Sequence, residues 1–411
     1  MLASLASIEL ISSPAVERIF SVLGSPEIDV RFVGGCVRDT LLRIDIKDID
    51  ISTPDLPQVV IEKLQQASIK VVPTGLAYGT VTAICDQKIV QITSLRKDTA
   101  CDGRHADVEY TKDWFEDASR RDFTFNALSL RPDGTLFDPF GGVSDAMAGR
   151  VKFVRDPYDR IQEDYLRILR FFRFQALYGK VTPDAEVLSA CQDMHSGLAK
   201  LSPERIQGEF FKILAAKAPL DALFAMLDSK VLSMICPEIE SLTDLTRLLE
   251  LENQFNINRN HKLWACRLAC LGASNVISIA NKLRMSKNDT RLVSEIFRAS
   301  SEVPESFCPK KCRYYLHKNG SDIAAKGILI AASRVKSENF IINEWYQFFQ
   351  LAKQWTTKVL PITGRDLAFL GVNQGPKVGQ WLSIAELQWI DNDFKPTKSD
   401  LMQFLKSKIN D

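Results

Sequence analysis

The stretch of sequence that decides the fold is Arg31-Phe32-Val33-Gly34-Gly35-Cys36-Val37-Arg38-Asp39. An apolar run enters a pair of glycines, and a helical pattern follows the pair. Backbone N–H groups can approach a phosphate closely where two residues lack Cβ, and the start of a helix favours anions. We therefore predict that Gly34, Gly35 and Arg38 cradle phosphate groups.

Two carboxylates follow shortly afterwards in the β-like run Lys47-Asp48-Ile49-Asp50-Ile51-Ser52. A strand period of two places Asp48 and Asp50 on one face and turns the two isoleucines toward the core. Neighbouring carboxylates repel each other, and a hard divalent cation relieves that repulsion. Each stretch by itself is common in unrelated proteins, but a phosphate cradle beside a metal-binding pair is typical of phosphoryl or nucleotidyl transfer.

Two further charged motifs follow along the chain, Arg120-Arg121-Asp122-Phe123-Thr124-Phe125-Asn126-Ala127 and Glu163-Asp164-Tyr165-Leu166-Arg167-Ile168-Leu169-Arg170. The order of the four motifs resembles that of the class II tRNA nucleotidyltransferases. These are the CCA-adding enzymes, relatives of bacterial poly(A) polymerases in the polymerase-β-like superfamily. The resemblance covers residues 31 to about 212 and continues more weakly to the C-terminus.

The resemblance implies an α+β fold, in which a polymerase-β-like nucleotidyltransferase head with a small mixed β-sheet precedes an all-α neck, body and tail. The residue pattern of the first part agrees with this fold. Helical patterns occur at 14–24 and 57–67, and strand-like runs occur at 69–73, 79–85 and 88–95. The implied units are a catalytic head at 1–142, a neck with the base-recognition helix at 143–215, a helical body at 216–300, and a helical, tRNA-binding tail at 301–411.

The third motif supplies the candidate nucleotide-binding residues Arg121, Asp122 and Asn126. Guanidinium groups can point at a triphosphate while the alternating phenylalanines anchor the segment. Asn126 offers both a donor and an acceptor to a ribose hydroxyl. The alternative interpretation of this motif is a structural cluster of salt bridges.

The fourth motif lies on a helix that we predict to begin at Pro157. Its spacing places Asp164 and Arg167 on one helix face, with Arg170 one turn further on, and an ordinary surface ion pair is the alternative. A carboxylate beside a guanidinium complements the amino donor and ring-nitrogen acceptor that cytosine and adenine share, and it mismatches uracil and guanine. In the family that the chain resembles, the acid and the arginine of this motif select the base. The resemblance therefore assigns acceptance of CTP and ATP to Asp164 and Arg167.

The segment between the second and third motifs holds two features that bear on mechanism. Gln91 lies in a predicted strand where a third carboxylate would be plausible, so we expect metal binding to rest on Asp48 and Asp50 without a third protein ligand from this strand. Residues 97–112 are polar and lack a clear period, which predicts a long surface loop. In the family, a flexible loop here accompanies the switch from C to A addition. Two residues are candidates for that loop function: Asp102 and Arg104.

The bulk composition is that of an ordinary globular protein. The chain has 411 residues, of which 45% are hydrophobic and 25% charged, with a formal net charge of +1. No apolar run approaches the roughly 20 residues that a membrane span needs, so we expect no membrane partner. The nine cysteines form no Cys-x-x-Cys pair, and the N-terminus lacks the features of a secretory signal. These features predict reduced thiols and a cytoplasmic location.

The C-terminal half is predicted to be nearly all helical and contains no catalytic constellation. Its basic residues are candidates for contact with the RNA backbone, and a solvated surface is the alternative for each of them. The tRNA-binding candidates are Lys310, Lys311, Arg313, Arg365 and Lys377.

The motifs and the family resemblance together imply a template-independent CCA tRNA nucleotidyltransferase. It would add or repair the 3′-terminal CCA of tRNA from CTP and ATP and release pyrophosphate, with Mg²⁺ as cofactor in a two-metal mechanism. The tRNA 3′ end and the two nucleotides are the predicted partners, and the oligomeric state is left open. The alternatives are an enzyme that adds only CC or only A, a bacterial poly(A) polymerase, and an inactive tRNA-binding protein.

Overall fold

The computed structural model describes residues 13–25, 28–101, 106–257, 263–272, 275–335, 341–372 and 375–410. The chain divides into two compact units, Met1–Pro237 and Glu238–Asp411. The first unit contains the β-sheets and the second is helical, so the expected α+β class is confirmed. The finer boundaries at residues 142, 215 and 300 stay predictions.

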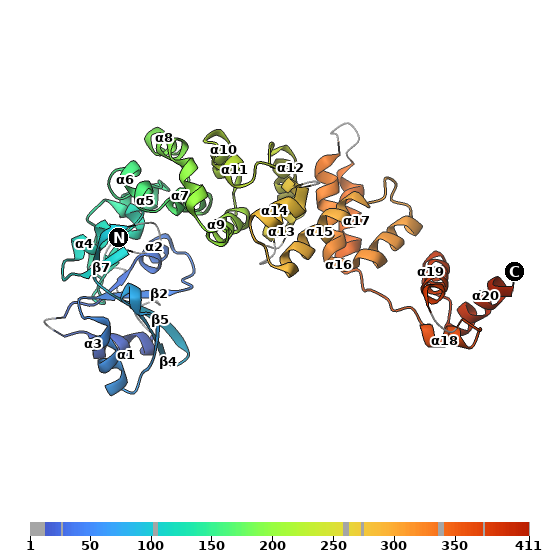
Figure 1. The fold of residues 1–411 in the computed structure, drawn as a ribbon, viewed down its shortest axis with the longest axis horizontal. Helices are drawn as coiled ribbons and strands as arrows, with labels where there is room; N and C mark the ends of the chain where they lie inside the picture. Colours follow the sequence, from blue (N-terminus) through green and yellow to red (C-terminus); the bar gives the residue numbers. More distant parts are fainter. Residues whose placement is uncertain are drawn as a thin grey trace. The chain divides into compact units, whose positions relative to one another are not determined.

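A seven-stranded mixed sheet forms the centre of the head (Figure 1). Its strand order is β3-β4-β5-β2-β1-β8-β9, and all neighbours pair antiparallel except β2 and β5, which run parallel. The strands are β1 (Arg31–Val33), β2 (Ile49–Thr53), β3 (Lys70–Gly75), β4 (Thr80–Cys85), β5 (Lys88–Ser94), β8 (Ser129–Leu130) and β9 (Leu136–Phe137).

One face of this sheet is covered by α1 (Pro14–Leu23) and α3 (Pro57–Gln66). Both helices begin with a proline at the first position, where the missing N–H is not needed. Their buried side chains pack with Ile51 of β2 and Ile92 of β5 in one hydrophobic core. Because this face is filled, the polar residues that alternate with the core residues of β2, β4 and β5 lie on the other face.

Residues 97–112 do not form the expected loop. The described parts of this segment form a two-stranded antiparallel ribbon of β6 (Arg96–Cys101) and β7 (Ala106–Tyr110). Lys97 pairs across the ribbon with Glu109, with 3.2 Å between Nζ and Oε1. The ribbon is held by backbone pairing, and its sequence lacks an apolar period of two, which explains why the sequence pattern missed it.

Helices make up most of the remainder of the first unit. They are α2 (Gly35–Leu42), α4 (Trp114–Ser119), α5 (Gly142–Ala148), α6 (Pro157–Glu163), α7 (Leu166–Tyr178), α8 (Ala185–Asp193), α9 (Pro203–Ala215), α10 (Leu220–Asp228) and α11 (Val231–Ile235), with a 3₁₀ turn, η3 (Thr124–Asn126). Phe123 and Phe125, on either side of the start of η3, are buried and contact Phe174 of α7, with ring centroids 5.2 and 5.4 Å apart. This aromatic cluster anchors the third motif against the fourth.

The second unit is a helical array with cores of its own. Its helices are α12 (Thr243–Gln254), α13 (Leu263–Gly272), α14 (Val276–Lys282), α15 (Lys287–Ser301), α16 (Pro309–Arg334), α17 (Ile342–Gln354), α18 (Gly364–Ala368), α19 (Pro376–Asp391) and α20 (Lys398–Asn410). A separate small core is formed by α18, α19 and α20 around Leu367, Trp389 and Leu405. No single described helix has the length and apolar character needed to cross a membrane, and α13 with α14 meets those criteria only as a bent pair.

Candidate active site

The Gly-Gly turn at the start of α2 brings Arg121 against the sheet. Gly34 has φ +71° and ψ −126°, and a Cβ built there would lie 3.0 Å from Nη1 of Arg121. Both the backbone conformation and the close approach therefore require glycine at this position. A Cβ at Gly35 would lie 3.6 Å from Nη2 of Arg38.

The two carboxylates of the second motif lie at the start of β2, beside this turn. Asp48 precedes the strand and is exposed, whereas Asp50 is half-buried and Ile51 is fully buried. Burial raises the pKa of Asp50, Arg121 opposes that shift, and the negative charge of Asp48 adds to it. The two acids thus repel each other within reach of one guanidinium. Their all-oxygen donor set and mutual repulsion fit a hard divalent cation.

Asp117, which the motifs did not reveal, orients the arginine pair. Its Oδ2 accepts from Nη2 of Arg121 at 3.1 Å, and its Oδ1 accepts from Nη2 of Arg120 at 2.7 Å. Although burial opposes ionisation, Arg121 and Arg120 hold the pKa of Asp117 below its usual value. The salt-bridge cluster that was the alternative interpretation of this motif is therefore present, and Arg121 is near enough to Asp50 to oppose the rise of its pKa.

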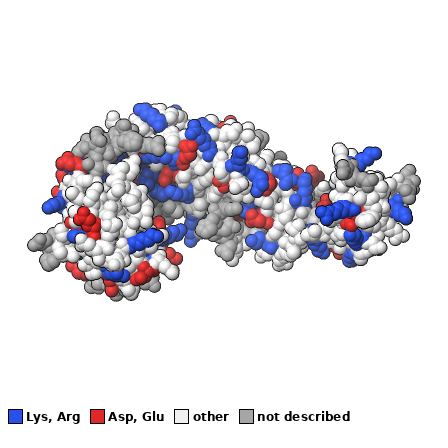
Figure 2. Space-filling model, turned by 60° about the horizontal axis from the view of Figure 1, so that its bottom comes forward, with Lys and Arg blue, Asp and Glu red and all other residues white. Residues whose placement is uncertain are grey.

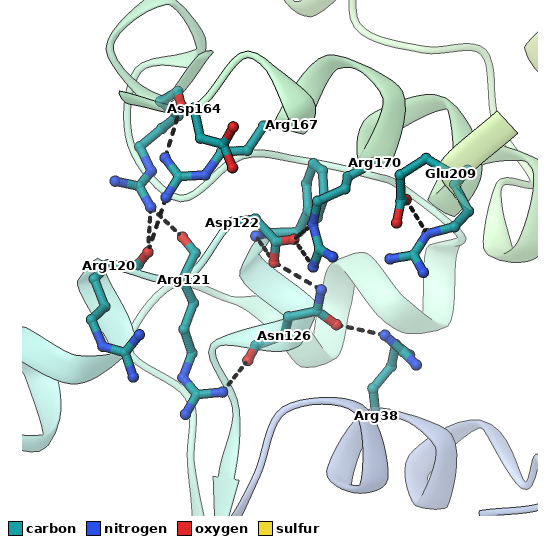
Figure 3. Close-up of polar contacts among 12 residues, drawn as sticks. Arg38, Arg120, Arg121, Asp122, Asn126, Asp164, Arg167, Arg170 and Glu209 are labelled. Atoms are coloured by element: carbon teal, nitrogen blue, oxygen red, sulfur yellow. Dashed lines mark hydrogen bonds and ion pairs between the residues drawn. The ribbon is translucent and has the colours of Figure 1, made fainter. Parts of the chain in front are cut away.

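Asp122, Asn126 and Arg170 form one network, in which Asp122 and Asn126 are buried and Arg170 is half-buried (Figure 3). The Asp122 carboxylate accepts from Nε of Arg170 at 2.7 Å and from Nδ2 of Asn126 at 2.9 Å. Although Asp122 is buried, which opposes ionisation, Arg170 and the hydrogen bond from Asn126 hold its pKa below the usual value. Three of the predicted nucleotide-binding residues are therefore brought together, from segments 48 residues apart.

Arg38 is buried, and it ties α2 to α7. It donates through Nε to Asp39, through Nη1 to Oδ1 of Asn126 and through Nη2 to the Tyr178 hydroxyl, at 2.9, 2.5 and 2.8 Å. Its guanidinium carbon also lies 4.2 Å from the centre of the Tyr178 ring. Burial raises the pKa of Tyr178 to about 12, so its hydroxyl stays protonated. Phosphate contact by Arg38 stays a prediction, since these partners use all three nitrogens here.

The helix expected from Pro157 onward is broken at Asp164. The break separates α6 from α7, and Asp164 has extended backbone angles of φ −152° and ψ 107°. Its Oδ1 accepts from the backbone N–H of Leu166, two residues further on, at 3.1 Å. Asp164 and Arg167 are still close, because the Arg167 N–H donates to the Asp164 carbonyl at 3.0 Å. The expectation that they share one face of a continuous helix is wrong.

Asp164 and Arg167 make ion pairs with other residues. Among residues 106–257, Asp164 pairs with Nη2 of Arg205 at 2.7 Å, and Arg167 pairs with Glu163. Arg167 also donates to the carbonyl oxygen of Arg160 at 2.8 Å. The simple ion pair between Asp164 and Arg167, which was the alternative interpretation, is therefore absent from this part of the chain.

Arg160 joins the third motif to the fourth. Its Nη2 donates to the carbonyl oxygens of Arg120 and Arg121 at 2.5 and 2.8 Å, and its Nη1 pairs with Glu163. Arg160 as a whole is only 4% exposed. The sequence held one signal for Arg160: it directly precedes Ile161, which lies on the apolar stripe of the predicted helix.

The remaining predicted residues belong to the loop segment and to the second unit. Asp102 and Arg104 fall outside the described residues. In α16, Lys310 pairs with Asp391 at 2.8 Å and Arg313 with Asp393 at 3.5 Å, so these two candidates link α16 to the end of α19. Lys311 donates to Ser306 at 3.4 Å. Arg365 and Lys377 are exposed, and Lys and Arg lie interspersed with Asp and Glu on the face in view (Figure 2).

Comparisons with known proteins bear on the whole chain. The family described as Poly A polymerase head domain matches residues 30–152, and the family described as the probable RNA and SrmB-binding site of polymerase A matches residues 180–243. The CCA-adding enzyme of Limosilactobacillus fermentum is 31% identical over 95% of this chain and 96% of its own length. The chain belongs to the family of CCA-adding enzymes. It is therefore a nucleotidyltransferase.

Other members of this family agree in sequence and in fold. The mouse protein named CCA tRNA nucleotidyltransferase 1, mitochondrial, is 31% identical over 92% of this chain and 86% of its own length. A crystal structure of the Bacillus stearothermophilus CCA-adding enzyme in complex with CTP has a TM-score of 0.77, with 23% identity over 97% of this chain and 98% of that one. The Thermotoga maritima CCA-adding enzyme complexed with tRNA has a TM-score of 0.70, with 18% identity over 99% and 98%. These structural likenesses show a shared fold.

Proposed function

We propose that this protein builds or repairs the 3′-terminal CCA of tRNA from CTP and ATP, releases pyrophosphate and uses no nucleic-acid template. The observation that carries the proposal is the convergence of three motifs. Arg121 joins the carboxylate pair to the third motif, and Arg160 and Arg170 join the third motif to the fourth. A nucleotide held in this region can contact groups for its phosphates, its ribose and its base together.

Gly34, Gly35 and Arg121 would hold the triphosphate, because a turn without Cβ atoms adjoins a guanidinium that Asp117 orients. Asp48 and Asp50 would hold a divalent cation, Mg²⁺ by its preference for oxygen ligands, which supplies charge neutralisation and lowers the pKa of the attacking hydroxyl when bound. Asn126 would orient the ribose, since Asp122 and Arg38 fix its amide from both ends. Each assignment is tested by substitution and kinetics.

Asp164 and Arg167 would select the base. Asp164 would accept from the exocyclic amino group of cytosine or adenine, and Arg167 would donate to the adjacent ring nitrogen. Uracil and guanine present the opposite order and would leave polar groups unpaired, which costs about 1–3 kcal/mol per group. Because Arg205 holds Asp164 and Glu163 holds Arg167, both side chains are oriented before a nucleotide arrives.

The test is incorporation into a tRNA that lacks its last three nucleotides, with labelled CTP and ATP supplied separately and together. We expect addition of two residues with CTP alone, no addition with ATP alone, and CCA followed by arrest with both. Long products from ATP alone would identify a poly(A) polymerase. Arrest after CC when both nucleotides are present would identify a CC-adding enzyme. Addition of A only to a tRNA that already ends in CC would identify an A-adding enzyme. No product under any condition would indicate an inactive tRNA-binding protein.

The cofactor and the compartment belong to the proposal as well. Dialysis against a chelator followed by addition of Mg²⁺ should abolish and restore incorporation. A cytoplasmic location is proposed from the composition, although curated relatives include proteins named as mitochondrial. Imaging of the tagged full chain in its own cells tests it.

A further inference from the structure

Gln91 lies directly beside Asp50 on the open face of the sheet. The parallel pairing of β2 with β5 sets Asp50 opposite Gln91. Val90 and Ile92, which flank Gln91, are buried at 0% and 1% exposure, whereas Gln91 is exposed. Gln91 therefore points away from the core, as Asp50 does. Neighbouring strands lie about 4.8 Å apart, so the two side chains are adjacent.

The two sides of Asp50 differ in charge. Toward β1 lie the Gly34 turn and the Arg121 guanidinium. On the other side, the same face carries Gln91 of β5 and then Thr82 of β4, which pairs with Gln91 across the two strands. Thr82 hydrogen-bonds Thr74 at 2.7 Å, so the face continues as neutral hydroxyl groups. The cationic side suits phosphates, and the neutral side adds no negative charge to the acid pair.

An amide oxygen is a competent ligand for a hard cation, but it contributes no charge. The affinity of an oxygen site for a divalent cation depends strongly on the number of carboxylates in it. Over the ranges described above, no group of three or more His, Cys, Asp or Glu side chains could hold a metal ion. No described acid therefore makes up for the neutral side chain at position 91.

We propose that Gln91 is a neutral third member of the cation site beside Asp50, and that it limits this site to two carboxylate charges; this replaces the sequence-based expectation that the strand supplies no third ligand. This inference rests on the proposed function, in which Asp48 and Asp50 hold the cation. Its consequence is that the protein without nucleotide retains divalent cations weakly. Tight binding then requires the phosphates of the incoming nucleotide.

The experiment measures Mn²⁺ binding to the full chain without nucleotide, by electron paramagnetic resonance of free Mn²⁺. Gln91→Glu should lower the dissociation constant by about tenfold, because it adds a third charge about one strand spacing from Asp50. The matched control is Gln58→Glu, which adds the same charge at an exposed position on α3, the helix that covers the opposite face. Equal dissociation constants for the two variants would overturn the proposal.

A second variant keeps the test decisive if Gln91→Glu fails to fold. Gln91→Ala removes the amide, and with CTP present it should weaken Mn²⁺ binding several-fold relative to the unchanged protein. Unchanged binding would overturn the proposal. The two proposals can fail separately. If the protein without substitutions completes CCA but Gln91→Glu and Gln58→Glu bind Mn²⁺ equally, only the inference about Gln91 is rejected. If the protein without substitutions adds no nucleotide but Gln91→Glu binds Mn²⁺ more tightly than Gln58→Glu, only the proposed function is rejected.

Discussion

Replacement of Asp164 by asparagine separates base selection from folding. Asparagine has nearly the same size and its amide oxygen also accepts hydrogen bonds, so the contact to the Leu166 N–H can persist. The ion pair with Arg205 is lost, but its two side chains are 25% and 30% exposed. A pair this exposed contributes at most about 1 kcal/mol to the free energy of unfolding. The melting temperature should therefore fall by only about 2–4 °C.

The effect on the nucleotide should be much larger. A hydrogen bond to a charged partner contributes about 1.5–3 kcal/mol, which corresponds to about 10- to 150-fold in kcat/KM for CTP. The new amide N–H₂ can donate to the carbonyl oxygen that uracil presents at the same place, so UTP should be used more readily. We expect the ratio of kcat/KM for CTP to that for UTP to fall at least about tenfold.

The assay is single-nucleotide incorporation into tRNA without its CCA end, with CTP and UTP measured separately. Asp159→Asn is the matched control, because Asp159 is an exposed acid in the preceding helix α6. A CTP-to-UTP ratio that is unchanged in a folded Asp164→Asn protein would refute the base-reading assignment.

Three further predictions address the head. Asp50→Asn should abolish nucleotide addition while raising the melting temperature, since the folded state raises the pKa of Asp50 and so disfavours its ionised form at neutral pH; retained tRNA binding in a filter assay is the control, and a lower melting temperature would contradict the reasoning. Gly34→Ala should lower the free energy of unfolding, measured by urea denaturation, by about 1–3 kcal/mol, because residue 34 has a φ of +71° and the new Cβ would lie 3.0 Å from Nη1 of Arg121. The depressed pKa values of Asp117 and Asp122 stabilise the protein above the unfolded value of 3.8, and this contribution is lost as pH falls through their lower folded values. Asp117→Asn should therefore lower the melting temperature at pH 7 and make its decline in acid shallower, and an equally steep decline would count against this account.

Much of the head could be predicted from the sequence because its signals are local. Alternation along β2 and β5 set the polar and apolar faces, and a helical apolar pattern marked α1 and α3. The glycine turn was recognisable because few residues other than glycine adopt the backbone conformation of Gly34. The order of the motifs then indicated the family, which the comparisons confirmed.

The site itself depends on contacts between distant segments, which no local pattern encodes. Many arginines could have paired with Asp164, and only the packing of α9 against α7 brings Arg205 to it. Asp117, Glu163 and Arg160 were missed for the same reason, since charged residues in helices are usually solvated. The break at Asp164 was hidden because the apolar stripe continues through it.

The sequence by itself determined the acid pair, the glycine turn, the third and fourth motifs and the fold class, since each depends on residue type and short spacing. Only the tertiary structure decided which guanidinium meets which carboxylate, that Arg38 joins α2 to Tyr178 across 140 residues, and that Gln91 adjoins Asp50. The physical reason is that charge and hydrogen bonding act over a few ångströms. Chain packing alone determines which side chains come within that range.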